Sequence, residues 1–381
     1  MRLVDVAIAG AGPAGSTAAL TLAREGFSVL LLDRAVFPRP KLCGGLLTWK
    51  AVRLLERLHG ATPADLLAGR VVNSVASSYS LYYRSSLFVS GRLAYPFHLV
   101  DRSAFDQFLL DRAVAAGAEL RQGCEVRACD SQGLLTTNQG PVRARLVIGA
   151  DGVHSVIRRL LPVSRSWWRQ GLATAMEIAV PRDRSPRCVD HPQLYAGMLK
   201  AGYGWVFPGQ NHMILGICGL PRHTPNFKAA FLDFLQVLGA PDPAGFLRDH
   251  PLRGHPLPYG NALTTPATNN VLLAGDAGGY ADPLLGEGIF YALLTGWQAG
   301  EAASLALRGQ IDAAQDYCRR IRRLVLPEMR GANRLRWLLH GLNLINPQNL
   351  GRYFRLRGSV LAEMVHGVRS YDWGRKKDWG F

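Results

Sequence analysis

The chain has 381 residues, 48% of them hydrophobic, and a formal net charge of +16 at pH 7. This length exceeds what one compact core usually organises, so we expect two globular domains. No run of 18 or more apolar residues occurs, and the six cysteines contain no CxxC pair. The sequence therefore predicts no transmembrane helix, no zinc site and no disulfide scaffold.

Residues 3–33 carry the most informative pattern. An apolar run is followed by a glycine-rich turn, a helix-like segment and a second apolar run that ends in Asp33. This order is the one that a dinucleotide-binding βαβ unit requires. In such a unit the glycines allow a tight turn, a close approach of the backbone to a pyrophosphate and close packing of the helix on the strand. The acid forms a hydrogen bond with the ribose. The predicted contacts are Gly10, Gly12, Pro13, Ala14, Gly15 and Asp33; the alternative is a glycine-rich turn without a ligand.

Two further apolar runs end in an acid beside a glycine. Asp151-Gly152 follows the run 146–150, and Gly275-Asp276 follows the run 271–274. Ligands of open α/β sheets bind at the carboxyl ends of the strands. A helix beginning after Gly286-Glu287-Gly288-Ile289 would point its N-terminus at an anionic group. Each motif taken alone is also compatible with an ordinary turn.

The intervening segments predict the rest of the fold. Residues 102–116 and 227–238 have helical patterns, whereas Gly117–Val126 and Val142–Ala150 have strand patterns. Alternating segments predict antiparallel strands at 71–97, 173–180 and 201–218. The prolines of Pro251–Pro258 indicate a loop that returns to the first domain. We expect an α/β protein with a Rossmann-like domain of residues 1–70, 98–162 and 260–320, an inserted antiparallel-sheet domain of residues 71–97 and 163–259, and a basic helical region, 321–381.

The glycine turn and the two acid–glycine motifs, in this order, resemble the FAD-dependent oxidoreductases of the p-hydroxybenzoate-hydroxylase-like class. The resemblance implies that FAD is the cofactor. In that class the second motif touches the pyrophosphate region, the third reaches the ribityl chain, and an arginine matching Arg102 lies near the cofactor. The further FAD contacts implied by the resemblance are Arg34, Cys43, Gly44, Arg102, Val126, Asp151, Gly152, Gly275, Asp276, Gly286, Gly288 and Ile289.

Two more motifs are similar to those of the geranylgeranyl reductase family. Pro38-Arg39-Pro40-Lys41-Leu42-Cys43-Gly44-Gly45 resembles its PxxKxCGG segment. Residues 203–208, YGWVFP, resemble its YxWxFP motif, which lines a lipid cavity. The family continues to Gly-x-Gly, but here Gly216-Ile217-Cys218 lacks the second glycine. The resemblance implies substrate contacts at Tyr203, Trp205, Phe207, Pro208 and Gly216.

By this resemblance the protein is a lipid-biosynthetic reductase that saturates C=C bonds of an isoprenoid chain with a hydride from reduced flavin. Cys43, Gly44 and Gly45 are its candidate catalytic residues, with Cys43 as proton donor, redox thiol or inert wall. Tyr203, Trp205 and Phe207 share one strand face and form either a substrate wall or part of the sheet core. The runner-up function is an oxygen-using monooxygenase or halogenase, and a third is a non-catalytic flavoprotein. NAD(P)H and ferredoxin both stay open as electron donor.

Basic residues are concentrated at the end of the chain, where residues 319–381 contain 14 Lys and Arg against four Asp and Glu. No nucleic-acid recognition module accompanies this surplus, so an anionic membrane surface or an acidic ferredoxin is the expected partner. Apolar residues recur at helical spacing within Arg334–Ile345, either to pack on the core or to contact a membrane. The first strand begins at Leu3, which leaves no room for a signal peptide. We expect a cytoplasmic protein, peripheral at the inner face of the membrane if this helix docks there.

Overall fold

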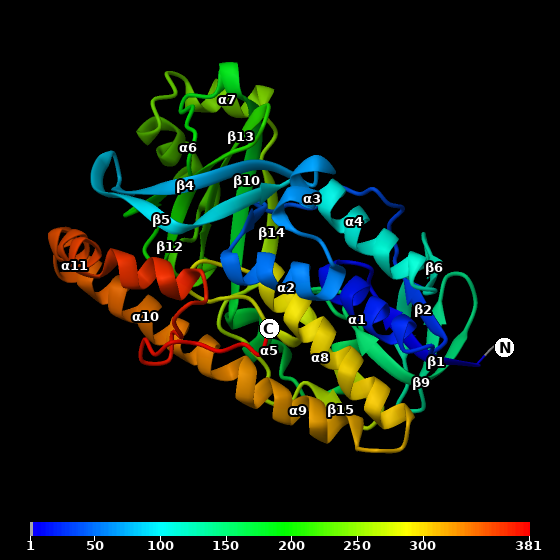
Figure 1. Cartoon of the computed structure of the whole chain (residues 1–381). Helices are drawn as coiled ribbons and strands as arrows, with labels where there is room; N and C mark the ends of the chain where they lie inside the picture. Colours follow the sequence, from blue (N-terminus) through cyan, green and yellow to red (C-terminus); the bar gives the residue numbers. More distant parts are fainter. Residues whose placement is uncertain (1–2) are drawn as a thin grey trace.

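The computed structural model describes residues 3–381, except for the side chains of 343–345 and 347. Two eight-stranded sheets form its framework, with helices packed around the first and a helical hairpin beside the second (Figure 1). The predicted α/β class with a Rossmann-like FAD-binding domain, an antiparallel sheet and a helical C-terminal region is confirmed.

The first sheet has the strand order β15-β16-β9-β1-β2-β6, and the strands from β16 to β6 run parallel. Its central strands are apolar and buried on both faces, as parallel strands covered by helices require. The pair β7–β8 extends β9 in antiparallel fashion. The strands are β1 (Leu3–Ala9), β2 (Val29–Leu32), β6 (Glu119–Arg121), β7 (Val126–Cys129), β8 (Leu134–Thr137), β9 (Val142–Gly149), β15 (Ala267–Thr268) and β16 (Val271–Leu273).

Helix α1 (Pro13–Arg24) packs between α8 (Ile289–Leu307) and α4 (Arg102–Ala115). Glycines of α8 allow the close approach of α1: a Cβ atom on Gly296 would lie 2.2 Å from the carbonyl oxygen of Ala14, and one on Gly300 would lie 2.9 Å from Cβ of Thr21. This tight packing holds the glycine turn before α1 against the loop that precedes α8.

The second sheet has the order β14-β10-β13-β12-β11-β4-β5-β3 and is antiparallel except between β11 and β4. Helices α6 (Phe227–Val237) and α7 (Pro243–Asp249) cover its outer face around a core of aromatic and aliphatic side chains. Its inner face is turned toward the first domain. The strands are β3 (Leu46–Leu47), β4 (Val72–Tyr83), β5 (Ser86–Val100), β10 (Leu172–Pro181), β11 (Gln193–Ala196), β12 (Gly202–Pro208), β13 (His212–Gly219) and β14 (Arg253–Pro258).

The C-terminal helices form a hairpin of α10 and α11, drawn in orange and red, and α11 packs against β5 (Figure 1). Beyond α11 the chain returns to the first domain, where the Trp379 ring lies 4.8 Å from that of Phe290. No helix in the described part of the chain is long and apolar enough to span a bilayer. The remaining helices are α2 (Trp49–His59), α3 (Pro63–Ala68), α5 (Arg165–Gln170), α9 (Ala313–Leu324), α10 (Leu326–Ile345) and α11 (Pro347–Val365).

Two predictions about local structure are wrong. Pro251–Pro258 was expected to be a loop, yet Arg253–Pro258 is strand β14, which pairs with β10 at the sheet edge. Prolines are tolerated there because an edge strand needs only one row of hydrogen bonds. Gly117–Val126 was expected to be one strand, but Gly123, with φ of +64°, separates β6 from β7.

Two short segments that we expected in the first domain pair within the second sheet. Strand β5 continues to Val100, and β3 at Leu46–Leu47 pairs with it. We therefore propose the domain boundaries given in the sequence analysis with one change. Residues 46–47 and 98–100 are assigned to the antiparallel-sheet domain instead of the Rossmann-like domain.

Candidate active site

A cavity of about 870 Å³ lies between the two domains. Its walls are the carboxyl ends of β1, β2 and β9, the loop 33–45, the loop before α8 and the inner face of the second sheet. The fold therefore brings together segments from almost the whole length of the chain.

The glycine turn after β1 cannot accept larger residues at two of its three glycines. Gly10 has φ of +98°, and a Cβ atom there would lie 2.3 Å from the Ala150 carbonyl oxygen. A Cβ on Gly15 would lie 1.8 Å from the Gly10 carbonyl oxygen. A Cβ on Gly12 would meet only Nη2 of Arg39 at 3.6 Å, because Gly12 faces the cavity.

The N-terminus of α1 points into this open space. Its N-cap, Gly12, provides no side chain, and Pro13 occupies the first turn. Unpaired backbone N–H groups at a helix N-terminus, together with the helix dipole, attract phosphate. The uncapped turn and the open side of Gly12 fit a pyrophosphate group.

Asp33 lines the cavity at the end of β2 and also ties the turn together. Its carboxylate accepts hydrogen bonds from the backbone N–H groups of Ala11 and Ala35, each at 2.8 Å. Arg34 is exposed at the same rim.

The two acid–glycine motifs lie where the strand ends predict. Asp151 accepts a hydrogen bond from Val156 N–H at 2.7 Å, and its Oδ1 is buried without a partner in the described residues. Asp276 lies deep in the cavity, and burial raises the pKa of both carboxyls. Gly275 donates its N–H to Oγ1 of Thr295 at 2.8 Å, which fastens the second motif to α8.

The loop before α8 is held by charged and polar groups from several elements. Asp282 accepts hydrogen bonds from the N–H groups of Leu284 and Leu285. Glu287 forms a buried ion pair with Lys50 at 2.7 Å. Gly288 and Ile289 follow, and α8 begins at the cavity wall without a side-chain cap.

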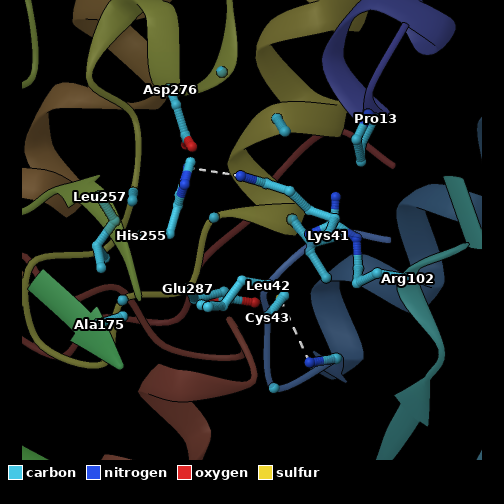
Figure 2. A pocket seen from close by; sticks show the side chains of 18 of the residues that line it. Pro13, Lys41, Leu42, Cys43, Arg102, Ala175, His255, Leu257, Asp276 and Glu287 are labelled. Carbon is cyan, nitrogen blue, oxygen red and sulfur yellow. Dashed lines mark hydrogen bonds between the residues drawn. The ribbon is translucent and has the colours of Figure 1, made fainter. Parts of the chain in front are cut away.

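Residues 39–45 form another wall of the cavity, and Figure 2 shows Lys41, Leu42 and Cys43 of this loop on the same cavity as Asp276. Lys41 Nζ donates a hydrogen bond to His255 Nε2 at 2.7 Å. Burial, followed by the charge of Lys41, lowers the pKa of His255 to about 4, so its ring is neutral at pH 7. Burial also lowers the pKa of Lys41, while Asp276 opposes that effect.

Cys43, Gly44 and Gly45 lie on the same loop and pack tightly against the second sheet. The Cys43 N–H donates to Oε1 of Glu177 at 2.9 Å, and the Gly45 N–H donates to the Cys43 sulfur at 3.4 Å. A Cβ on Gly44 would lie 2.7 Å from the Phe207 ring. Gly45, with φ of +68°, leaves no room for a Cβ beside the Val100 carbonyl oxygen at 2.1 Å.

Arg102 borders this loop and is oriented by Asp106. Two hydrogen bonds of 2.8 and 2.9 Å join them, and Arg39 also lies 3.3 Å from the Asp106 carboxylate. Burial alone would lower the pKa of Arg102, but Asp106 and the Cys43 sulfur outweigh it and raise the pKa. Arg102 is therefore a permanent positive charge at the cavity.

Tyr203, Trp205 and Phe207 line the cavity from β12, with neighbouring ring centroids 5.9 and 6.2 Å apart. The hydroxyl of Tyr203 donates a hydrogen bond to the carbonyl oxygen of Leu285, which links this wall to the loop before α8. Gly216 lies behind Trp205, and Pro208 ends the strand; neither lines the cavity.

Beyond the aromatic wall the cavity continues as an apolar passage. Leu81 and Leu93 of the β4–β5 hairpin face it, as do Phe354, Leu361 and Val365 of α11. From α10, Leu339 also lines it. Leu338, in contrast, is half exposed, so the apolar stripe of α10 serves both the cavity and the surface. The prediction for Ile345 falls outside the described side chains.

Most of the expected site residues lie together on this cavity. Gly15, Pro208 and Gly216 support its walls from behind. The cavity also has lining that the motifs did not predict, from α11 and from three further residues: His154, Glu177 and His255. Glu177 could have been predicted from the sequence, because it is an acidic residue at an inward-facing position of a strand whose other inward-facing residues are apolar. The expected residues that line the cavity are Gly10, Gly12, Pro13, Ala14, Asp33, Arg34, Cys43, Gly44, Gly45, Arg102, Val126, Asp151, Gly152, Tyr203, Trp205, Phe207, Gly275, Asp276, Gly286, Gly288 and Ile289.

The parallel sheet with its glycine turn and the two acid–glycine motifs define a flavoprotein oxidoreductase. Residues 3–214 match the FAD-binding domain family, and FAD is the cofactor. The chain belongs to the geranylgeranyl reductase family of FAD-dependent oxidoreductases.

Named relatives show how broad this family is. The chain is 33% identical over 320 residues to the menaquinone reductase of Mycolicibacterium smegmatis, covering 78% of this chain and 75% of that protein. It is 30% identical to the digeranylgeranylglycerophospholipid reductase of Methanosarcina acetivorans, covering 80% and 76%.

Solved structures agree on the fold. A geranylgeranyl bacteriochlorophyll reductase-like protein from Thermoplasma acidophilum superposes with a TM-score of 0.73 at 20% identity, covering 96% of this chain and 92% of that one. A flavin-dependent brominase superposes with a TM-score of 0.72 at 19% identity, covering 96% and 94%. The fold alone therefore does not separate reductases from halogenases.

Proposed function

We propose that this protein uses FAD to saturate C=C bonds of an isoprenoid chain. The observation that carries the proposal is the apolar lining that the cavity receives from the aromatic wall, α11 and the β4–β5 hairpin, together with the Cys43 loop. A cavity lined by aliphatic and aromatic side chains from both domains and α11 suits an apolar polyprenyl tail.

Different residues of the chain bind FAD and orient the isoprenoid. The turn at Gly12 and the N-terminus of α1 would hold the pyrophosphate of FAD, and the N-terminus of α8 would stabilise an anionic edge of the flavin ring. Reduced FAD, when bound, supplies a hydride, which is the hard chemistry of the reaction. Trp205 and Phe207 hold the isoprenoid against the Cys43–Gly45 loop and exclude water.

The names of the relatives support the same substrate class. Menaquinone and digeranylgeranylglycerophospholipid, which appear in those names, both carry isoprenoid chains. A monooxygenase or halogenase is the second candidate, and it is supported by a fold shared with solved structures such as the brominase, at identities of 20% or less. The electron donor is NAD(P)H or a ferredoxin, and the basic surface favours an acidic ferredoxin.

The basic C-terminal hairpin supplies a membrane-facing surface. Leu356 is 81% exposed, between the exposed Arg355 and Arg357 of α11. Trp373 is 79% exposed in the tail that follows. Because the opposite face of α11 lines the apolar passage, an isoprenoid could pass from an anionic bilayer into the cavity beneath this helix.

An anaerobic single turnover tests the proposed function. The protein is reduced with dithionite and mixed with geranylgeranyl diphosphate or menaquinone. Tandem mass spectrometry looks for isoprenoid fragments heavier by steps of two hydrogens, which distinguishes C=C saturation from reduction of the quinone ring. Such products, with recovery of the oxidised flavin spectrum, are expected. A flavin that stays reduced until oxygen is admitted, and then yields an oxygenated or halogenated product, would favour the second candidate. FAD binding without turnover of any of these compounds would indicate a non-catalytic flavoprotein.

A matched variant tests the passage itself. Leu361→Trp would place an indole in the part of the cavity that α11 lines. We expect the variant to bind FAD normally and to keep reducing a two-unit prenyl chain while losing the four-unit chain. Equal loss of both chains would contradict the proposed route.

A further inference from the structure

Glu177 is a carboxyl group at the cavity that the motifs do not account for. It lies on β10 and lines the cavity beside the Cys43 loop. Oε1 accepts the Cys43 N–H at 2.9 Å, whereas Oε2 is buried without a hydrogen-bond partner in the described residues. A buried polar oxygen without a partner is costly, and native folds seldom keep one without a reason.

The sheet register places this carboxyl beside the aromatic wall. Glu177 pairs with Gly216 on β13, and Gly216 pairs in turn with Trp205 on β12. Because paired positions share a face, all three are turned toward the cavity side. Gly216 has no side chain, and the Trp205 indole occupies the space above it, so no other residue of this row separates Glu177 from Trp205.

The charges around Glu177 come from three other elements. Lys41 lies on the loop that also carries Cys43, Arg102 begins α4, and Arg253 pairs with Glu177 from β14. His255, two residues along β14, is neutral at pH 7. Burial raises the pKa of Glu177 to about 7, although the Cys43 N–H bond and these three cations each lower it. The group therefore holds a proton in a large fraction of molecules at neutral pH.

We propose that Glu177 is the proton donor of the reduction, an inference that rests on the proposed reductase function. The hydride adds to one carbon of the double bond. The O–H bond of Glu177 breaks as its proton forms the C–H bond at the other carbon. The carboxylate that remains takes a proton from solvent before the next turnover. Proton and hydride together add two hydrogens, which balances the saturation of one C=C bond.

Cys43 is the competing proton donor. Its sulfur already accepts the Gly45 N–H at 3.4 Å, and its backbone is fastened to Glu177. A carboxylic acid is also a stronger acid than a thiol. The geometry assigns Cys43 the role of holding the carboxyl in place and Glu177 that of giving up the proton.

Glu177→Gln tests the assignment because the amide keeps an acceptor for Cys43 N–H but cannot supply an acidic proton. We expect FAD and isoprenoid to bind as in the wild type, while the single-turnover rate falls by about 100-fold or more. Glu177→Asp retains the acid on a shorter side chain and should keep a larger share of the rate. Glu56→Gln, at a half-exposed position of α2 away from the cavity lining, serves as the matched control. A Glu177→Gln protein that reduces the lipid at the wild-type rate would overturn the proposal.

A second readout does not depend on turnover. Infrared difference spectra between wild type and Glu177→Gln, recorded with FAD bound and no lipid, should show a protonated carboxyl band at pH 6 that disappears by pH 8. A band for an ionised carboxylate at pH 6 would overturn the proposal even if the protein reduces isoprenoids. If the wild type shows the protonated band but reduces no isoprenoid, the proposed function fails, and the donor role fails with it.

Discussion

A Cβ atom on Gly216 would lie 2.1 Å from Cζ2 of Trp205, the residue paired with it on the neighbouring strand. The absence of a side chain at Gly216 therefore allows the indole to lie flat against the sheet, where its face forms part of the cavity wall. In the Gly-x-Gly pattern of the family, Gly216 matches the first glycine, whereas Cys218 replaces the second.

Gly216→Ala should displace the Trp205 indole toward the cavity. Overpacking of this kind usually costs about 1–3 kcal/mol of stability. We expect the variant to keep FAD, because Gly216 is remote from the glycine turn, but to bind the isoprenoid more weakly. Titration of the flavin spectrum with lipid measures the change. Gly209→Ala, in the turn between β12 and β13, is the control, and equal weakening by both variants would contradict this account.

The glycine turn offers a matched pair of substitutions with different expected results. Gly15→Ala would place a methyl group 1.8 Å from the Gly10 carbonyl oxygen and should destabilise the fold by about 1–3 kcal/mol. Gly12→Ala has open space and should fold normally, yet its methyl group enters the region where we place the pyrophosphate. We expect FAD affinity to drop about tenfold or more, which is about 1.4 kcal/mol. Thermal unfolding of the FAD-free proteins and fluorescence titration with FAD separate the two effects.

Acid should destabilise the fold through His59. Burial, followed by Arg24 and Arg112, lowers the pKa of His59 to about 3, from an ordinary value of 6.5. Between these values the unfolded chain binds the proton and the folded chain does not, so this contribution to stability is lost as the pH falls below 6.5. Relative to His59→Gln, the wild type should lose about 2 kcal/mol between pH 7 and pH 5.

Urea unfolding of both proteins at the two pH values measures this difference. Comparison with His59→Gln is needed because Glu177, whose pKa is raised, stabilises the fold on acidification and opposes the histidine. A difference between the two proteins that does not change with pH would show that folding leaves the pKa of His59 unchanged, and it would contradict this prediction.

Binding to anionic vesicles should depend on the exposed apolar residues of α11. We expect the protein to sediment with vesicles of phosphatidylglycerol and phosphatidylcholine, less so at high salt, and weakly with phosphatidylcholine alone. Leu356→Glu should weaken this binding by about 1.5–3 kcal/mol, the value of one buried leucine side chain. Leu67→Glu changes an exposed leucine of α3 and should have no effect. Equal binding by both variants would place the contact elsewhere.

The local motifs predicted the first domain well because their information lies within short segments. A strand, a glycine turn, a helix and an acid within residues 3–33 leave few other arrangements of backbone. The conformations of Gly10 and Gly45 follow from the same local constraint, since both have φ values that favour glycine. The prediction of a loop at Arg253–Pro258 was wrong because proline is tolerated in edge strands. The residues of a strand do not by themselves show whether it lies at the edge of a sheet.

The amino-acid sequence by itself determined the flavin-binding unit and the family, since turn chemistry and strand pattern are properties of neighbouring residues. Only the tertiary structure decided how the cavity is closed. Glu177 meets the Cys43 backbone across 134 residues, and α11 reaches the same cavity from the far end of the chain. Such contacts depend on sheet register and on the docking of helices against distant strands. No local periodicity encodes either, so the proton donor and the lipid-binding cavity that we propose could be derived only from the folded chain.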